Sequence, residues 1–361
     1  MAMQATLNHF FFMRNEITHM TQQALSKARN HFDHSPFYKA FNAVINEEYS
    51  LEKDSNLKRL YGYKIIAIDG SIIPLPNLPG LKTEFGQINN SPSARASIAL
   101  DILNDRILDA DLKAVSVDER TMAANHIEQL SYKMKMDDTI LIFDRGYPSK
   151  DLVAQIVRKN AKYIMRVRKK FNLSVDSAPM GSSIIELEEG VNVRVVKFLL
   201  PSREVETLIT NLFEMPTLRF ESLYFLRWPV EIKYDIIKNK LELPNFTGHT
   251  VNIIYQDFWI SMLLANVASI AKADADRIVQ IRKTGKENKY DYQTNVNNIV
   301  ASLRDRFADA VFCSNPVIRT IRVNRIIHEV SLSAVPKRPG RKIARNDARN
   351  VKYHHNKKSN V

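Results

Sequence analysis

The chain has 361 residues, of which 45% are hydrophobic and 25% are charged, a composition that argues against wholesale disorder, collagen or a coiled-coil fibre and suggests two or three domains. Lys and Arg outnumber Asp and Glu by 52 to 39, and the net charge of +13 favours a polyanionic partner, either nucleic acid or an anionic membrane surface. The single cysteine, Cys313, excludes an intramolecular disulfide framework and a cysteine-rich zinc module, and it fits a reducing compartment.

The N-terminal sequence lacks the order of regions found in a signal peptide, because its apolar patch covers only residues 10–13. The most apolar stretch, residues 258–271, is interrupted by Ser261, Asn266 and Ser269 and is shorter than the ~20 residues that span a membrane. We therefore expect a buried helix there, and a soluble, intracellular protein.

Two helices are predicted in the first 60 residues. Thr21 is suited to cap a helix over residues 22–29. A second helix follows Ser35 and Pro36, because apolar residues recur after them at helical spacing. Two short helices joined by a polar turn suit a small DNA-binding head and suit an ordinary helical cap equally well.

Strands and helices alternate in the middle of the chain. The predicted strands are 64–69, 94–103, 106–112, 139–144 and 163–167, and the predicted helices are 119–134 and 149–160. This order indicates a mixed α/β sheet with helices for both faces. Residues 183–212 then alternate in the manner of added antiparallel strands, and residues 218–273 are again helical.

Two apolar strands lead into an acid, Asp69 and Asp144, and each acid precedes a turn that contains glycine. Ligands gather at strand ends in α/β sheets, although a single carboxylate there more often caps a turn or a helix. Two carboxylates that meet at one site repel each other, so the pair implies a cation that holds them together.

A third group of polar residues, Tyr224, Arg227, Glu231 and Lys238, follows at steps of 3, 4 and 7 residues, which keep side chains on one helical face. The alternative is a surface pair of Arg227 and Glu231 with an unrelated lysine. Because Pro229 cannot donate a backbone hydrogen bond, we expect the helix either to start there or to kink, with Tyr224 and Arg227 on a preceding turn.

This spacing resembles the YREK signature of bacterial insertion-sequence transposases of the DDE class. Residues 68–71 (IDGS) and 143–147 (FDRGY) look like the segments around that family's first two acids. Residues 210–212 and 243–248 are similar to its flanking sequences, and residues 20–29 resemble its N-terminal DNA-binding segment. The resemblance covers roughly residues 18–270.

The resemblance implies an RNase H-like fold, which is a mixed five-stranded sheet with flanking helices. Along the chain we expect a helical N-terminal DNA-binding region (1–60), the first part of the catalytic domain (61–172), a β-rich insertion (173–212), the second part of the catalytic domain with the YREK helix (213–275), a C-terminal helical region (276–335) and a basic disordered tail (336–361). The tail has nine basic residues and one acid, Asp347, and it serves either to contact phosphates or only to solubilise the chain.

The resemblance also implies the activity, which is cleavage at transposon ends and strand transfer into target DNA. Asp69, Asp144 and Glu231 would be the catalytic and metal-binding triad for two Mg²⁺ ions, with Mn²⁺ as a substitute. Tyr224, Arg227 and Lys238 would bind DNA phosphates. The implied partners are double-stranded DNA with terminal inverted repeats, target DNA and a second copy of the chain in a synaptic complex. The implied location is the cytoplasm, at the bacterial nucleoid, without a membrane.

Two alternatives remain open. A non-catalytic DNA-binding remnant or repressor derived from such an element would share the basic charge, and another RNase H-like nuclease would share the acids but give no reason for the neighbouring tyrosine and basic residues. Phe198 and Phe213 could stack on a flipped DNA base, although core packing explains them more simply. Trp228, beside the third acid, is predicted to be buried at the start of a helix.

Overall fold

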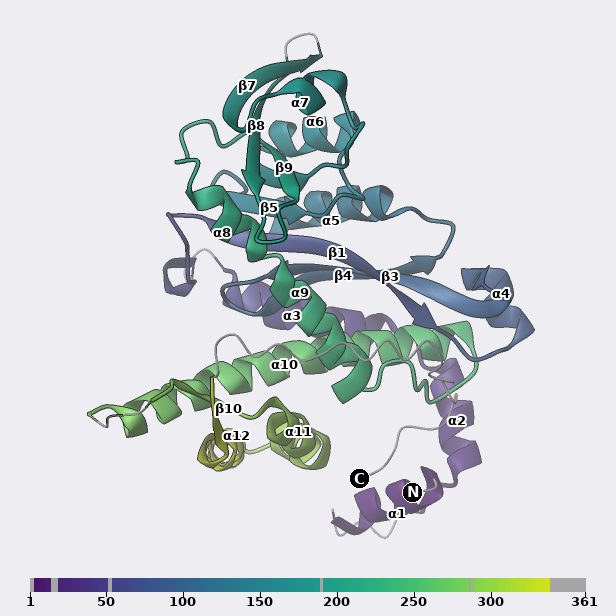
Figure 1. Cartoon of the computed structure of the whole chain (residues 1–361). Helices are drawn as coiled ribbons and strands as arrows, with labels where there is room; N and C mark the ends of the chain where they lie inside the picture. The colour runs from purple at the N-terminus through teal and green to yellow at the C-terminus, as the bar shows by residue number, and fades with distance from the viewer. Residues whose placement is uncertain are drawn as a thin grey trace.

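A mixed sheet of nine strands organises the fold (Figure 1). The computed structural model describes residues 3–13, 19–50, 54–188, 191–285, 287 and 289–337. The strands are β1 (Lys64–Pro74), β2 (Gln87–Ile88), β3 (Ser91–Asp101), β4 (Arg106–Ala114), β5 (Thr139–Phe143), β6 (Lys162–Arg166), β7 (Gly181–Glu188), β8 (Val191–Leu199) and β9 (Val205–Thr210).

Five of these strands form the mixed sheet that the sequence predicted. They lie in the order β4-β3-β1-β5-β6. The β1–β3 and β3–β4 pairs are antiparallel, whereas β1, β5 and β6 are parallel. The inserted strands continue this sheet, because β9 pairs antiparallel with β6 and is followed by β8 and β7. The insertion thereby covers the edge of β6, which would otherwise present unpaired backbone groups.

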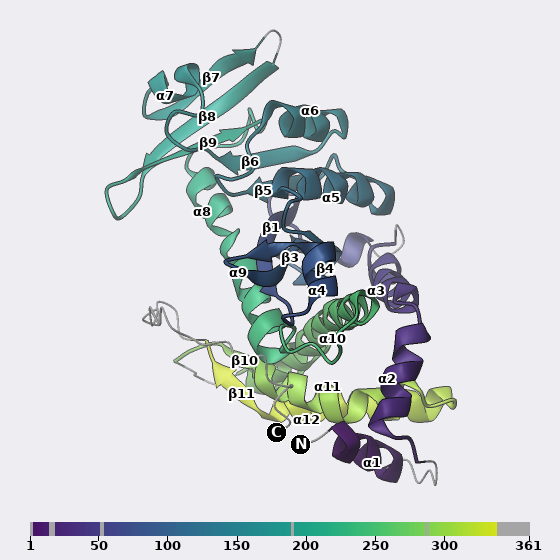
Figure 2. The ribbon, with the colours of Figure 1, turned by 90° about the vertical axis from the view of Figure 1, so that its right-hand side faces the viewer.

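The apolar runs of β1 and β5 arise because parallel strands are covered on both faces. Alternate side chains enter different core clusters. Leu141 and Phe143 pack with α5 (Glu119–Lys133) and α6 (Lys150–Arg158). On the opposite face, where α8 (Arg219–Phe225) packs, lie Ile65, Ile140, Ile142, Ile164, Phe220 and Leu223. Figure 2 shows α5 and α6 on one side of the sheet, with α8 and α9 (Trp228–Asp235) on the other.

The predicted N-terminal helices are α2 (Gln22–His31) and α3 (Ser35–Glu48). The Thr21 hydroxyl caps α2 by accepting a hydrogen bond from the backbone N–H of Ala24. Helix α3 packs on the long α10 (Val251–Lys283), which runs beside β4 (Figure 1). Helix α10 is long and apolar enough to cross a membrane, but 67% of its apolar window is buried inside the fold, so it is the buried helix that the sequence predicted.

The other elements surround this framework. They are α1 (Met3–Met13), η1 (Asp54–Asn56), α4 (Pro79–Phe85), α7 (Leu173–Ser177), η2 (Ile236–Lys240), β10 (Tyr292–Thr294), α11 (Val296–Val311), α12 (Pro316–Leu332) and β11 (Ala334–Pro336). Strands β10 and β11 form a separate antiparallel pair. The predicted disordered tail falls outside the described residues from position 338 onward.

Candidate active site

Asp69 and Asp144 lie where the pairing between β1 and β5 stops. The parallel register reaches Ala67 and Ile142, and Asp144 directly follows β5. The prediction that a strand ends at Asp69 is wrong, because β1 stays paired with β3 as far as Pro74. Asp69 is therefore held on one side by β3, beyond the last paired residues of β1 and β5.

Glu231 reaches these acids from α9. The helical segment is divided, since α8 ends at Phe225 and α9 begins at Trp228, with Pro229 in its first turn. Proline fits this position because the N–H groups of the first turn have no partner within the helix. Further along α9, the hydroxyl of Tyr234 donates to the backbone carbonyl of Asp69 at 2.9 Å, which fixes the helix to β1.

Arg227 and Tyr224 connect the three acids. The Arg227 Nη1 atom lies 3.3 Å from Asp69 Oδ2, and its Nη2 atom donates to Glu231 Oε1 at 2.7 Å. The Tyr224 hydroxyl donates to Asp144 Oδ1 at 3.1 Å. Five of the six residues selected from the sequence thus lie together in two hydrogen-bonded groups, and the charge of Arg227 also acts on Asp144.

Lys238 is the sixth, and it contacts β1 further along the strand. Its Nζ atom donates to Ser71 Oγ at 2.6 Å and to the carbonyl of Ile72 at 3.0 Å. The residue belongs to η2, a π-helical turn, which changes the angular step between side chains. The predicted single stripe of four residues on one helix is therefore interrupted before Lys238.

Arg166 and Glu206 extend the group around Asp144 and were missed from the sequence. Arg166 Nη1 lies 3.8 Å from Asp144 Oδ1, and its Nε donates to Glu206 Oε1 at 2.5 Å. Arg166 ends β6 and the buried Glu206 lies in β9, so an inserted strand orients an arginine beside the second acid. The sequence signal for this pair is a basic residue, Arg166, in one mainly apolar strand and an acidic residue, Glu206, in another.

Burial and neighbouring groups shift the pKa values of Asp69 and Asp144 in opposite directions. Burial raises the pKa of Asp69 to about 6; Arg227 opposes this rise, and the nearby charges of Asp144 and Glu119 add to it. Burial also raises the pKa of Asp144, but the backbone N–H of Arg145, the guanidinium of Arg227 and the Tyr224 hydroxyl together bring it below its ordinary value. The charge of Asp69 is thus less compensated than that of Asp144.

The three acids suit a divalent cation in chemistry, because carboxylate oxygens are the preferred ligands of Mg²⁺ and Mn²⁺. Within the described part of the chain, however, no three Asp, Glu, His or Cys side chains lie close enough together to hold a metal ion. The guanidinium of Arg227 instead bridges Asp69 and Glu231.

Two aromatic side chains beside the site are about half exposed. Trp228 is 51% exposed and Phe225 is 50% exposed, so the prediction of a buried Trp228 is wrong. Both lie at the break between α8 and α9, where neither helix covers its neighbour's end. Of the two phenylalanines from the insertion, Phe198 packs against the cluster under α8, whereas Phe213 is 38% exposed.

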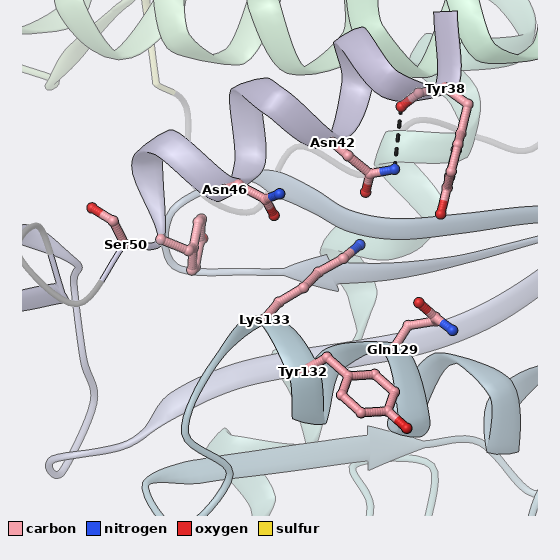
Figure 3. Close-up of a pocket in the computed structure, with 8 residues that line it drawn as sticks. Tyr38, Asn42, Asn46, Ser50, Gln129, Tyr132 and Lys133 are labelled. Atoms are coloured by element: carbon pink, nitrogen blue, oxygen red, sulfur yellow. Dashed lines mark hydrogen bonds between the residues drawn. The ribbon is translucent and has the colours of Figure 1, made fainter. Parts of the chain in front are cut away.

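A separate hollow of about 540 Å³ lies between α3 and α5 (Figure 3). Its lining is polar and includes Asn42, Asn46, Gln129 and Lys133. Lys133 is at the opposite end of α5 from Glu119, a distance of about 21 Å along the helix axis. The hollow is therefore remote from the acids.

Comparison with known proteins gives three results. Residues 60–267 match a family model described as "Transposase DDE domain". The chain is 23% identical over 261 residues to a Sinorhizobium fredii (strain NBRC 101917 / NGR234) protein named "Putative transposase y4zB". The aligned region covers 63% of this chain and 67% of that protein. A piggyBac transposase solved by cryo-EM in a synaptic complex with hairpin DNA is 9% identical with a TM-score of 0.45; the match covers 73% of this chain and 57% of that one.

Proposed function

Because the chain belongs to the Transposase DDE domain family, we propose that it is a DNA transposase that cleaves DNA at the ends of a mobile element and joins those ends to target DNA. Asp69, Asp144 and Glu231 would be its catalytic carboxylates. The single observation that carries this assignment is their convergence: acids from β1, the loop after β5 and α9 meet around Arg227 and Tyr224.

Asp69, Asp144 and Glu231 would hold the divalent cations, Mg²⁺ with Mn²⁺ as a substitute. Bound there, two such ions would supply activation of the attacking water or 3′-hydroxyl and stabilisation of the leaving oxygen. The hydroxyl of Tyr224 fixes the orientation of the Asp144 carboxylate, and Arg166 contributes a second positive charge beside it.

Arg227 has two roles in this proposal. Without DNA, its guanidinium neutralises Asp69 and Glu231. With DNA, the same planar group is suited to bind a phosphate through two parallel hydrogen bonds. Tyr224 and Lys238 would contact phosphates beside it, and Lys238 would first exchange its hydrogen bond to Ser71 for one to the DNA.

The partners follow from charge and from the chemistry of the reaction. A net charge of +13 favours a polyanion, and we propose double-stranded DNA with terminal inverted repeats as the donor and a second duplex as the target. Two ends must be brought together before they are joined, so we propose a homodimer in the synaptic complex.

The test is nicking of a duplex that carries the inverted repeats bounding the gene, in Mg²⁺ or Mn²⁺. We expect Asp69→Asn, Asp144→Asn and Glu231→Gln each to abolish nicking while DNA binding is retained. The matched control is Asp235→Asn, since this exposed acid on the same helix accepts a hydrogen bond from Asn239. Wild-type nicking by the three variants would refute the assignment.

The non-catalytic alternative draws on one observation, which is that Arg227 bridges two of the acids while no three acids in the described part of the chain can hold a metal ion. A DNA-binding remnant would bind the inverted repeats without nicking them in either metal. That result, with wild-type protein that is folded, would favour the remnant over the enzyme.

A further inference from the structure

A fourth carboxylate, that of Glu119, lies between the segments that carry Asp69 and Asp144. A Cβ atom placed on Gly70 would be 3.1 Å from Glu119 Oε1, and one placed on Gly146 would be 3.5 Å from Oε2. Gly70 directly follows the first acid, and Gly146 comes two residues after the second. The Glu119 side chain therefore occupies the space that a Cβ atom would need at both glycines beside the acids.

Glu119 is itself held firmly in place. It is the first residue of α5, and its Oε1 accepts a hydrogen bond from Arg95 Nη1 on β3 at 2.7 Å. The next residue, Arg120, donates from Nε to the carbonyl of Gly146 at 3.1 Å. The start of α5 is thus attached to β3 on one side and to the turn after Asp144 on the other.

Two polar atoms beside Glu119 are buried without a hydrogen-bond partner among the residues that the structure describes, namely the Nε atom of Arg95 and the hydroxyl of Tyr147. Tyr147 follows Gly146, and its ring is only 1% exposed. Unpartnered buried donors are rare, because each loses its hydrogen bonds to water. Both atoms lie in the polar cluster around Glu119.

Backbone pairing does not set the separation of Asp69 and Asp144. The hydrogen-bonded register of β1 and β5 stops at Ala67 and Ile142, and the two acids lie beyond it. Beyond the paired residues, an element that reaches both segments helps to hold them in a fixed relation by packing, although the charge of Glu119 itself adds to the repulsion on Asp69. Glu119 spans both.

We propose that Glu119 is a positioning residue that fixes the separation of the Asp69 and Asp144 carboxylates through its contacts with Gly70 and Gly146. This inference rests on the proposed function, since it assigns Glu119 a role in the same site. Glu119 acts through the two glycine segments, and Arg95 holds it in place.

The test compares Glu119→Ala, which removes the contact, with Glu119→Gln, which keeps its shape and one hydrogen-bond acceptor for Arg95. Two quantities are measured on the full chain: Mn²⁺ affinity by calorimetry without DNA, and kcat and KM for nicking of the inverted-repeat duplex. Glu128→Ala is the matched control, because this glutamate lies on the same helix and pairs with Lys159. Thermal unfolding verifies that each variant is folded.

For Glu119→Ala we expect kcat to fall about 100-fold with KM for DNA unchanged, the loss that a displacement of about 1 Å causes. We expect its Mn²⁺ affinity to fall about tenfold, as for other residues that orient metal ligands. Glu119→Gln should retain most of the wild-type kcat and Mn²⁺ affinity, and Glu128→Ala should retain all of both.

If wild-type protein nicks DNA and binds Mn²⁺, and folded Glu119→Ala does both equally well, this inference is overturned while the proposed function stands. If Glu119→Ala does not fold, Glu119→Asp is tested in its place, because aspartate keeps the charge but is too short to reach both glycines. If the Mn²⁺ affinity and nicking kinetics of Glu119→Asp equal those of the wild type, the inference is overturned. Wild-type protein that neither nicks nor binds Mn²⁺ overturns the proposed function, and the inference with it.

Discussion

Replacing Arg227 with alanine should tighten Mn²⁺ binding to the DNA-free protein. The guanidinium bridges Asp69 and Glu231 at 3.3 and 2.7 Å, and any cation that enters must displace it. A hydrogen bond to a charged group contributes about 1.5–3 kcal/mol. The bond to Glu231 is discounted because that side chain is 35% exposed. The two contacts then total about 3 kcal/mol, which corresponds to roughly a 100-fold change in affinity.

Calorimetric titration of Mn²⁺ into the metal-free, DNA-free protein measures this change. Arg227→Lys should tighten binding much less, because lysine keeps a positive charge near the acids but cannot contact both with a planar fork. Arg219→Ala is the control, since this arginine on α8 lies over the ring of Tyr61 at 4.0 Å rather than on the acids. Adding Asp69→Asn to Arg227→Ala should abolish the gain.

The reasoning is refuted if folded Arg227→Ala binds Mn²⁺ no more tightly than the wild type, because the guanidinium would then not compete for the acids. Nicking is expected to move in the opposite direction. Loss of the group proposed to hold the DNA phosphate should lower the cleavage rate even as metal affinity rises. A variant that gains in both would show that Arg227 only obstructs the site.

Other predictions concern Asp69 and the basic tail. Burial raises the pKa of Asp69 from 3.8 to about 6, so the native state binds more protons than the unfolded state between these pH values and wild-type stability falls as pH rises through them. Above pH 6, metal-free Asp69→Asn should therefore have a free energy of unfolding that is higher than that of the wild type by at most about 3 kcal/mol, and the difference should vanish towards pH 4. Denaturant titration measures it, and equal unfolding midpoints at pH 8 would contradict this prediction. Mn²⁺ affinity should fall about tenfold per pH unit below pH 6, because the ion must displace the Asp69 proton, and a flat calorimetric profile between pH 5 and 8 would count against it. Deleting residues 338–361, which leaves Pro336 paired with Tyr292, should flatten the dependence of log K for DNA on log salt, whereas an unchanged slope would mean that the tail contacts no phosphate.

Local patterns predicted most of the secondary structure near the site. Continuous apolar runs indicated β1 and β5, and the polar cap at Thr21 indicated the start of α2. The predicted strands 94–103 and 106–112 are present as β3 and β4, which pair antiparallel across a turn with a left-handed φ of 57° at Asp105. Each of these features depends on residues close in sequence, which is why spacing alone could reveal it.

The errors have a common physical origin. A strand end was expected at Asp69 because the apolar run stops there, but pairing with β3 carries β1 on to Pro74. The third motif was expected to form one polar stripe with a helix start or kink at Pro229. The helix does begin beside Pro229, but Lys238 lies in a π-helical turn and contacts β1 further along the strand than Arg227 does. Backbone hydrogen bonds decided both cases, to the neighbouring strand in the first and within the helical segment itself in the second, and hydrophobic periodicity does not report them.

The sequence by itself determined the family resemblance, the kinds of charged groups and the elements that carry them, because these follow from composition and from neighbours along the chain. Only the tertiary structure decided which charges meet. Arg227 contacts Asp69 across 158 residues of sequence, and Glu119 lies beside both Gly70 within β1 and Gly146 after β5. The physical reason is that these contacts depend on how β1, β5, α5 and α9 pack, and packing brings together side chains that no local pattern relates.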